Sequence, residues 1–164
     1  MTSILKVSEI QDPTNGNTAA TITTSGGLQA SKVYPSGLSY WPSFQARKTS
    51  GGNQTGLLTF ATVTFDKGSN FTSGASAKFT APVDGVYYFA YSAVKAADTT
   101  GSTIVLVKNG SDTEITVYSG NGAYDGLTLS GALELNATDY VQIKANIAVQ
   151  EQYGCWSGFL VTAT

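Results

Sequence analysis

The stretch from Lys78 to Ser92 constrains the fold of this chain more than any other part of it. Pro82 fixes its own φ and pushes the residue before it towards an extended conformation, so we expect a short strand to end there. Asp84 and Gly85 then have turn chemistry, because the aspartate can bond the backbone ahead and glycine tolerates a positive φ. The residues from Val86 onward are mostly β-branched or aromatic, which predicts a second, longer strand.

Alternation along this second strand divides its side chains between two faces. The two sets are Tyr87, Phe89 and Tyr91 on one side and Val86, Tyr88 and Ala90 on the other. Both sets are apolar or aromatic, so we expect cover on both sides. One face would belong to the core of a β-sandwich, and the other would contact a partner subunit.

Further strand-like segments follow from Ser39 onward, separated by stretches rich in turn formers. No segment shows a sustained helical period. The predicted strands are Ser43–Lys48, Leu57–Phe60, Thr62–Asp66, Lys78–Ala81, Val86–Lys95, Thr103–Lys108, Thr113–Tyr118, Gly126–Leu135, Tyr140–Ala148 and Gly158–Thr162. Short strands at such spacing indicate an all-β sandwich or barrel.

The run FTAPVDGVYYFAYS resembles the signature of the C1q-like family, whose members form jelly-roll trimers related to tumour necrosis factor. Other family-like segments occur in the family's order, and the resemblance spans Ser43 to Val161. These segments are Phe44–Arg47 with Val63–Asp66, Leu106–Gly110 (LVKNG), Leu127–Gly131 leading to Leu133–Leu135 and Asp139–Val141, and Trp156–Val161.

The resemblance implies a two-sheet jelly-roll sandwich assembled as a homotrimer. In the family this aromatic strand lies near the three-fold axis. We therefore expect Tyr87, Phe89 and Tyr91, with Phe159 on the final strand, in or next to the subunit contact.

Residues 1–38 differ in composition from residues 39–164, which predicts an extended N-terminal arm before the β-domain. The arm is rich in Thr, Ala, Ser and Gly and cannot bury much apolar area, so it would be flexible or ordered only against neighbours. Its opening SILKVSEIQD, with TNGN and a Thr-rich tail, resembles the N-terminus of structural proteins of tailed bacteriophages. There such a segment precedes an exchangeable C-terminal domain. Ile4, Leu5, Val7 and Ile10 would then attach the chain to the particle; the alternative is an ordinary polar leader.

The composition excludes several kinds of partner. Charged residues make up 12% of the chain and the net charge is −2, so there is no electrostatic footprint for nucleic acid. No apolar run is long enough for a transmembrane helix, and the first residues lack the pattern of a secretory signal. Cys155 is the only cysteine, which excludes an intrachain disulfide. It is either a small buried apolar residue or a reactive or intersubunit thiol.

The sequence offers no catalytic arrangement. The absence of histidine excludes Ser-His-Asp and Cys-His catalysis and histidine-based metal sites. The acidic residues are scattered singly in predicted turns, where they would cap the turns; calcium binding in loops, known in the family, is the alternative. No dedicated ligand set can be named, so we expect no metal, no cofactor and no enzymatic activity.

Several aromatic residues fall in loops or at strand ends: Tyr34, Tyr40, Trp41, Tyr118, Tyr124, Tyr153 and Trp156. Exposed Tyr and Trp beside Asn and Asp suit a carbohydrate, because the ring covers a sugar face while polar groups form hydrogen bonds. They equally suit protein interfaces or the core. Tyr118 and Tyr124, with Asn121 in the loop that they bracket, are the predicted ligand-binding residues.

Together these features predict a structural protein of a phage particle, either a head or tail fibre-like element or a decoration spike. The arm would bind other virion proteins, and the trimeric head would contact a host surface glycan or protein by multivalent binding. The alternatives are a cellular C1q-like binding module, lectin-type or on a surface, and a decoration protein that only stabilises a capsid. The host, the ligand and the position on the particle stay open.

Overall fold

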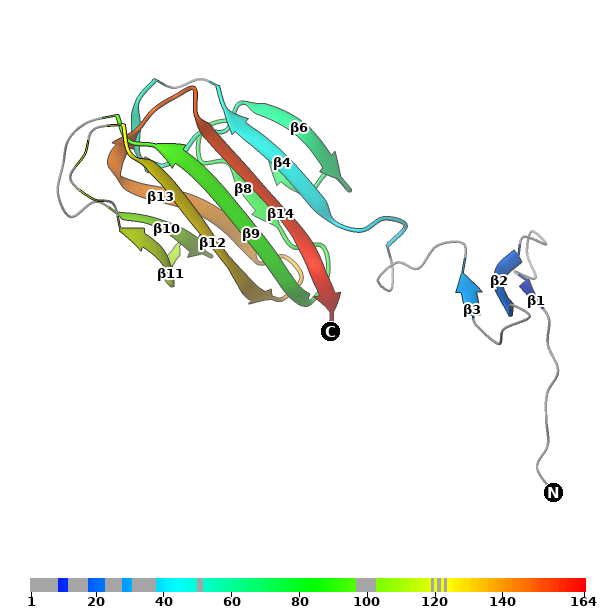
Figure 1. Cartoon of the computed structure of the whole chain (residues 1–164). Coiled ribbons are helices and arrows are strands. Elements are labelled where there is room, and N and C mark those ends of the chain that lie inside the picture. The colour runs from blue at the N-terminus through cyan, green and yellow to red at the C-terminus, as the bar shows by residue number, and fades with distance from the viewer. Residues whose placement is uncertain are drawn as a thin grey trace.

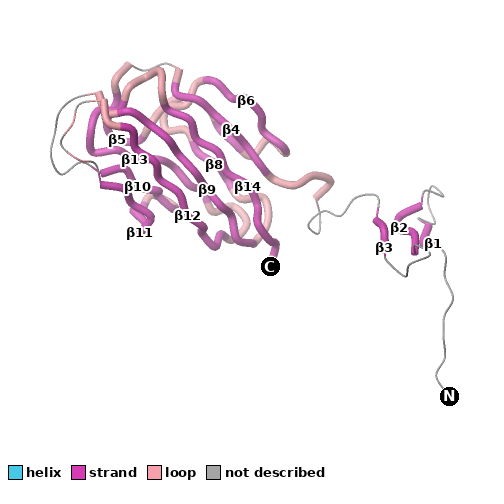
Figure 2. The backbone as a smooth tube through the Cα atoms, viewed as in Figure 1, coloured by secondary structure: helices cyan, strands magenta, loops and turns pink. Residues whose placement is uncertain are grey.

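The structure is a computed structural model, and it describes residues 9–11, 18–22, 28–30, 38–49, 52–96, 103–118, 120, 122 and 124–164. These residues form strands, turns and loops, with no helix among them (Figure 2). Within the same ranges the chain therefore contains no helix with the length and hydropathy needed to cross a membrane.

Two antiparallel sheets pack face to face (Figure 1). In sheet order, the five-stranded sheet comprises β12 (Gly126–Leu135), β9 (Gly85–Val94), β14 (Gly154–Ala163), β4 (Ser43–Lys48) and β6 (Thr62–Lys67). The six-stranded sheet comprises β11 (Ser111–Tyr118), β10 (Thr103–Lys108), β13 (Tyr140–Val149), β8 (Lys78–Thr80) and β7 (Phe71–Thr72), with β5 (Gln54–Leu57) also paired to β13. This arrangement confirms the predicted all-β, two-sheet sandwich.

An aromatic cluster fills the space between the sheets. Phe44 lies at its centre, with ring centroids 4.6 Å from Phe71, 5.1 Å from Phe79 and 5.0 Å from Trp156. Phe44 and Trp156 come from the five-stranded sheet, and Phe71 and Phe79 come from the other. Burying such a side chain completely stabilises the fold by about 1.5–3 kcal/mol, so this cluster holds the two sheets together.

The aromatic strand β9 lies between β12 and β14 and alternates as predicted, but one inference from it was wrong. Tyr87, Phe89 and Tyr91 are all buried inside the sandwich, with at most 1% of their surface exposed. They therefore belong to the core of a single chain and have no surface left for a subunit contact. The alternation separates the two faces without saying which one is inside, and the opposing aromatic residues of β7 and β8 decide that the larger rings face inward. Phe159 is 46% exposed, so its place at a contact stays a prediction.

The predicted strand bounds agree for some strands and not for others, and a neighbour on each side does not decide which. β4, β10 and β12 have the predicted ends. β14 begins at Gly154 rather than Gly158, because Gly154 pairs with β4 and Cys155–Ser157 pair with both β4 and β9. Gly154 and Ser157 are weak strand formers, so there was little sign of this extension in the sequence. β5 ends at Leu57 where a strand was expected to begin, and β7 was not predicted.

Within the predicted arm, β1 (Glu9–Gln11), β2 (Thr18–Ile22) and β3 (Leu28–Ala30) form a three-stranded antiparallel sheet. The sequence did not predict these strands. Ile10 pairs with Ala20 in this sheet. The other three expected attachment residues, Ile4, Leu5 and Val7, lie outside the described residues.

The chain enters the sandwich beside its own C-terminal strand. The indole Nε1 of Trp41 donates a hydrogen bond to the carbonyl oxygen of Leu160, and the amide of Leu160 donates to the carbonyl oxygen of Pro42 at 3.0 Å. Ser43 then pairs with Phe159. The opposite end of β4, at Lys48, pairs with the start of β14, so the sandwich has an arm end and a loop end (Figure 1).

Candidate functional site

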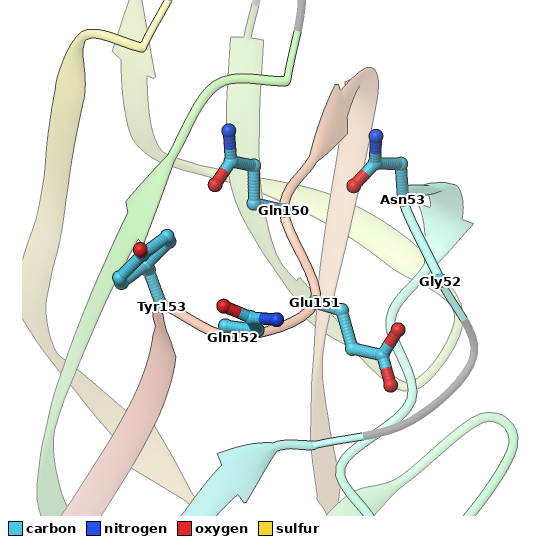
Figure 3. A pocket seen from close by; sticks show the side chains of 6 residues that line it. All are labelled: Gly52, Asn53, Gln150, Glu151, Gln152 and Tyr153. Carbon is cyan, nitrogen blue, oxygen red and sulfur yellow. The ribbon is translucent and has the colours of Figure 1, made fainter.

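Two loops form a polar hollow at the loop end of the sandwich (Figure 3). One loop joins β4 to β5 and the other joins β13 to β14. The hollow has a volume of about 390 Å³, and the residues that line it are Gly52, Asn53, Gln150, Glu151, Gln152 and Tyr153. Small-ligand sites typically have volumes of about 300–1,000 Å³, so the hollow has room for a small molecule.

Backbone pairing fixes the ends of both loops. Val149, before the second loop, pairs with Gln54 and also bridges to Lys95. The amide of Gln150 donates to the carbonyl oxygen of Val94 at 2.9 Å. Asn53 and Gln150 therefore project from backbone that these pairs and hydrogen bonds hold.

Lys48 fixes the floor of the first loop. Its side chain is fully buried, and its ammonium group donates a hydrogen bond to the carbonyl oxygen of Gly52. Burial lowers the pKa of Lys48, and the negative charge of Glu151 opposes that shift. The ammonium group of Lys48 therefore interacts with groups of both loops, the Gly52 carbonyl and the Glu151 carboxylate, and Lys48 does not line the hollow.

The lining offers planar polar groups and one aromatic ring. Asn53, Gln150 and Gln152 each carry an amide that both donates and accepts hydrogen bonds, whereas the ionised carboxylate of Glu151 only accepts. Tyr153 is 56% exposed and its ring stands beside these groups (Figure 3). The arrangement can hold a neutral polar molecule by several hydrogen bonds against one ring.

The predicted ligand-binding residues lie elsewhere. Tyr118 is 74% exposed on β11 and Tyr124 is 69% exposed, so both side chains are accessible, but neither lines the hollow. Asn121 lies outside the described residues. The binding role of these three residues stays a prediction.

Among the other predicted aromatic residues, only Tyr153 lines this hollow. Trp156 belongs to the core, and Trp41 ties the start of the domain to β14. Tyr34 lies outside the described residues. The sequence analysis did not single out Gln150–Gln152. The sequence feature that could have indicated this site is Gln150–Gln152, two amides around a carboxylate, followed directly by Tyr153 between two strands.

The second surface of interest is the outer face of the five-stranded sheet. Phe159 and Tyr88 contact each other across β14 and β9, with ring centroids 5.7 Å apart. Val161 is 49% exposed further along β14, and Phe65 is 41% exposed on β6. Val86, Ala90 and the half-buried free thiol of Cys155 share this outer face by alternation. We call this set the outer apolar face.

Asp66 and Asp139 accept hydrogen bonds in turns, as predicted, whereas the Asp112 carboxylate on β11 pairs with the ammonium group of Lys144 on β13. The Asp66 carboxylate accepts hydrogen bonds from the amides of Asn70 and Phe71 at 3.1 and 3.0 Å. Asp139 accepts from the Asn109 side chain at 2.7 Å and from the Asn136 amide at 2.9 Å.

The pKa of Asp139 is lowered to about 2, most strongly by the hydrogen bond from Asn109. The Asn136 amide and the ammonium group of Lys108, at 3.0 Å, lower it further. Across the described ranges, no three His, Cys, Asp or Glu side chains come together in a way that could hold a metal ion.

Comparison with known proteins agrees with this architecture. The globular domain of the zebrafish complement 1qA protein superimposes with a TM-score of 0.59 at 22% sequence identity, over 76% of this chain and all of that one. Murine APRIL at pH 5.0 superimposes with a TM-score of 0.60 at 11% identity, over 74% of this chain and all of that one. At these identities the likeness concerns the fold. No curated protein gives a significant sequence match.

The family model of the C1q domain matches residues 43–161, which include all of both sheets except the last residues of β14. The match covers well over half of the chain, and the observed sandwich is the fold that this family implies. The chain therefore belongs to the C1q domain family.

Proposed function

We propose that this protein is a non-enzymatic binding module that assembles as a homotrimer through the outer apolar face. The observation that carries the proposal is the exposed aromatic and aliphatic set on the five-stranded sheet, centred on Phe159 and Tyr88. Large apolar side chains exposed together on one sheet face mark an interaction site. Members of the C1q and tumour necrosis factor families also commonly form homotrimers.

The chemistry of this face favours a second copy of the chain over a charged partner. Alternation places Val86, Tyr88 and Ala90 in one row along β9, with no charged residue between them. The charged residues around this row are Glu134 on β12, opposite Val86, Arg47 on β4, opposite Cys155, and Lys67 on β6, opposite Ser43. An apolar centre with a polar rim is the usual anatomy of a stable protein interface.

We further propose that the trimer is a structural element of a phage particle, carried on its surface in the capsid or tail. Residues 1–38 would bind other virion proteins through Ile4, Leu5, Val7 and Ile10. The resemblance of this segment to phage structural proteins supports the proposal. The geometry supports it too, because the chain enters at the arm end and leaves the loop end free to face a host surface. Three sites per trimer and several trimers per particle would turn weak contacts into firm attachment.

The test is the solution mass of the full chain by sedimentation, with Phe159→Lys as the variant. The wild-type chain is expected to be trimeric, and the variant to dissociate, because the new ammonium group would be buried in the contact without a partner. Tyr118→Lys is the matched control, since Tyr118 is even more exposed but lies on the other sheet. A monomeric wild-type chain, or a Phe159→Lys variant that stays trimeric, contradicts the proposed contact.

Particle attachment needs a separate measurement. Chains that lack residues 1–38 should still be trimers but should no longer bind purified particles that have been stripped of this protein. If they bind as well as the full chain does, the arm has no attachment role. If removal of the arm abolishes the trimer, the arm is an assembly element and a lattice-stabilising role replaces surface display.

A further inference from the structure

We propose that the hollow between the β4–β5 and β13–β14 loops is a binding site for a neutral saccharide. The site would be formed by Asn53, Gln150, Glu151, Gln152 and Tyr153. The inference deepens the proposed binding function, since it names the class of ligand. The hollow is complete within one chain, so the site can exist whether or not the trimer forms.

The lining excludes the other common classes of small ligand. No lysine or arginine lines the hollow, and the carboxylate of Glu151 would repel an anion such as phosphate. Glu151 is also the only carboxylate in the lining, too few for a dedicated cation site, and the described residues contain no metal-ligand cluster. An apolar ligand would leave the amides without hydrogen-bond partners, which is costly.

The groups that are present match the hydroxyl groups of a sugar. Each hydroxyl is at once a donor and an acceptor, and the three amides offer both kinds of partner. The Glu151 carboxylate can accept from two neighbouring hydroxyls, giving charge-assisted bonds that need no charge on the ligand. Figure 3 shows the amides of Asn53 and Gln150 pointing in the same direction, with Glu151 and Gln152 nearby on the β13–β14 loop.

Tyr153 supplies the part of the site that hydrogen bonds cannot. Its ring is 56% exposed at the edge of the hollow, where it can cover the apolar C–H face of a sugar ring. The next residue, Gly154, faces the inside of the sandwich, where an added Cβ would lie 2.8 Å from the Cβ of Lys48. Because side chains alternate along an extended chain, the Tyr153 ring lies on the outer side.

The position of the site fits a role in surface contact. Gly154 and Lys48 pair at the loop end, whereas Trp41 and Pro42 bind Leu160 at the arm end. The hollow therefore opens at the end of the sandwich opposite to the point where the arm enters. A saccharide displayed on a surface can reach it while the arm end is occupied.

The test uses the full chain and saturation-transfer NMR with methyl glycosides of glucose, galactose, mannose and N-acetylglucosamine, and with disaccharides built from them, at millimolar concentration. We expect transfer to at least one of these sugars. Tyr153→Ala should weaken that binding about tenfold through loss of the stacked ring, and Gln150→Ala should weaken it as well. Tyr153→Phe keeps the ring and should retain most of the binding.

Glu114→Ala is the control, because Glu114 is exposed on β11 and does not line the hollow. Tyr118→Ala tests the other predicted aromatic surface, at the end of β11. Absence of transfer to every sugar in the panel overturns the proposal. So does binding that survives Tyr153→Ala but is lost in Tyr118→Ala, which assigns the sugar to the other aromatic surface. Sedimentation of the same samples separates this result from the trimer: a trimeric chain without sugar binding contradicts only the saccharide site, and a sugar-binding monomer contradicts only the trimer.

Discussion

Replacing Gly158 with alanine should overpack the aromatic core between the two sheets. Gly158 pairs with Phe89 on β9 and with Phe44 on β4, and the three share the inner face. An added Cβ would lie 2.6 Å from Cδ1 of Phe89 and 2.8 Å from Cε1 of Phe44. Ordinary van der Waals contacts for such a carbon are at least about 3.4 Å, so both rings would have to move.

The rings have little freedom to move. Both are fully buried, and Phe44 stacks on Phe71 and Phe79 from the opposite sheet. Overpacking of this kind costs about 1–3 kcal/mol. The lower backbone entropy of alanine in the unfolded chain returns about 0.4–1 kcal/mol. We therefore expect Gly158→Ala to lower the free energy of unfolding by about 1–2 kcal/mol.

Urea unfolding at a fixed protein concentration measures this change, because any self-association adds to the apparent stability. Gly126→Ala is the control: Gly126 begins β12, and its added Cβ would have no neighbour within 4 Å. That variant should be as stable as the wild type or slightly more stable. The double variant Gly158→Ala with Phe89→Leu should be more stable than the sum of the two single changes predicts. If Gly158→Ala matches Gly126→Ala in stability, the rigid aromatic layer that we describe does not exist.

Three further changes test particular contacts. Asp139→Asn should remove part of the loss of folding stability in acid. The pKa of Asp139 in the folded protein is about 2, below its ordinary value, so the carboxylate stabilises the fold above about pH 4 and this contribution is lost as the pH falls towards 2. Urea unfolding across this pH range measures the change. Tyr87→Phe should reduce the loss of folding stability at alkaline pH. Burial raises the pKa of Tyr87 to about 12, so between pH 10 and 12 the unfolded chain loses this proton before the folded chain does. Circular dichroism at these pH values follows the unfolding. Trp41→Phe should lower the free energy of unfolding by about 1 kcal/mol, because it removes the hydrogen bond to Leu160. Faster hydrogen exchange of the Leu160 amide, which bonds to Pro42, is the readout.

Much of the sandwich could be predicted from local sequence. The proline and Asp-Gly turn before β9, and the Asn109-Gly110 hairpin between β10 and β11, give strand ends directly because the residue types dictate the backbone conformation. Asn109 and Gly110 both have positive φ values, 50° and 84°, as that turn requires. β7 escaped prediction because Phe71 and Thr72 form a strand of two residues, too short for any alternation to show.

The faces and the hollow depend on contacts between distant segments. Alternation placed Tyr87 and Tyr88 on opposite sides of β9, but only the aromatic residues of the second sheet determine which side is the core. The hollow joins Asn53 to Gln150–Tyr153, nearly a hundred residues apart in sequence, through the pairing of Gln54 with Val149. Nothing local to either loop indicates that pairing.

The hydrogen bond between Trp41 and Leu160 has a mechanical consequence. A load applied between the arm end and the loop end would run parallel to β4 and β14. The ladder of residue pairs from Ser43–Phe159 to Lys48–Gly154 lies across that direction, so its hydrogen bonds would be sheared together rather than peeled apart one after another. A domain tethered at one end and loaded at the other would thus resist traction with all the residue pairs of this ladder at once.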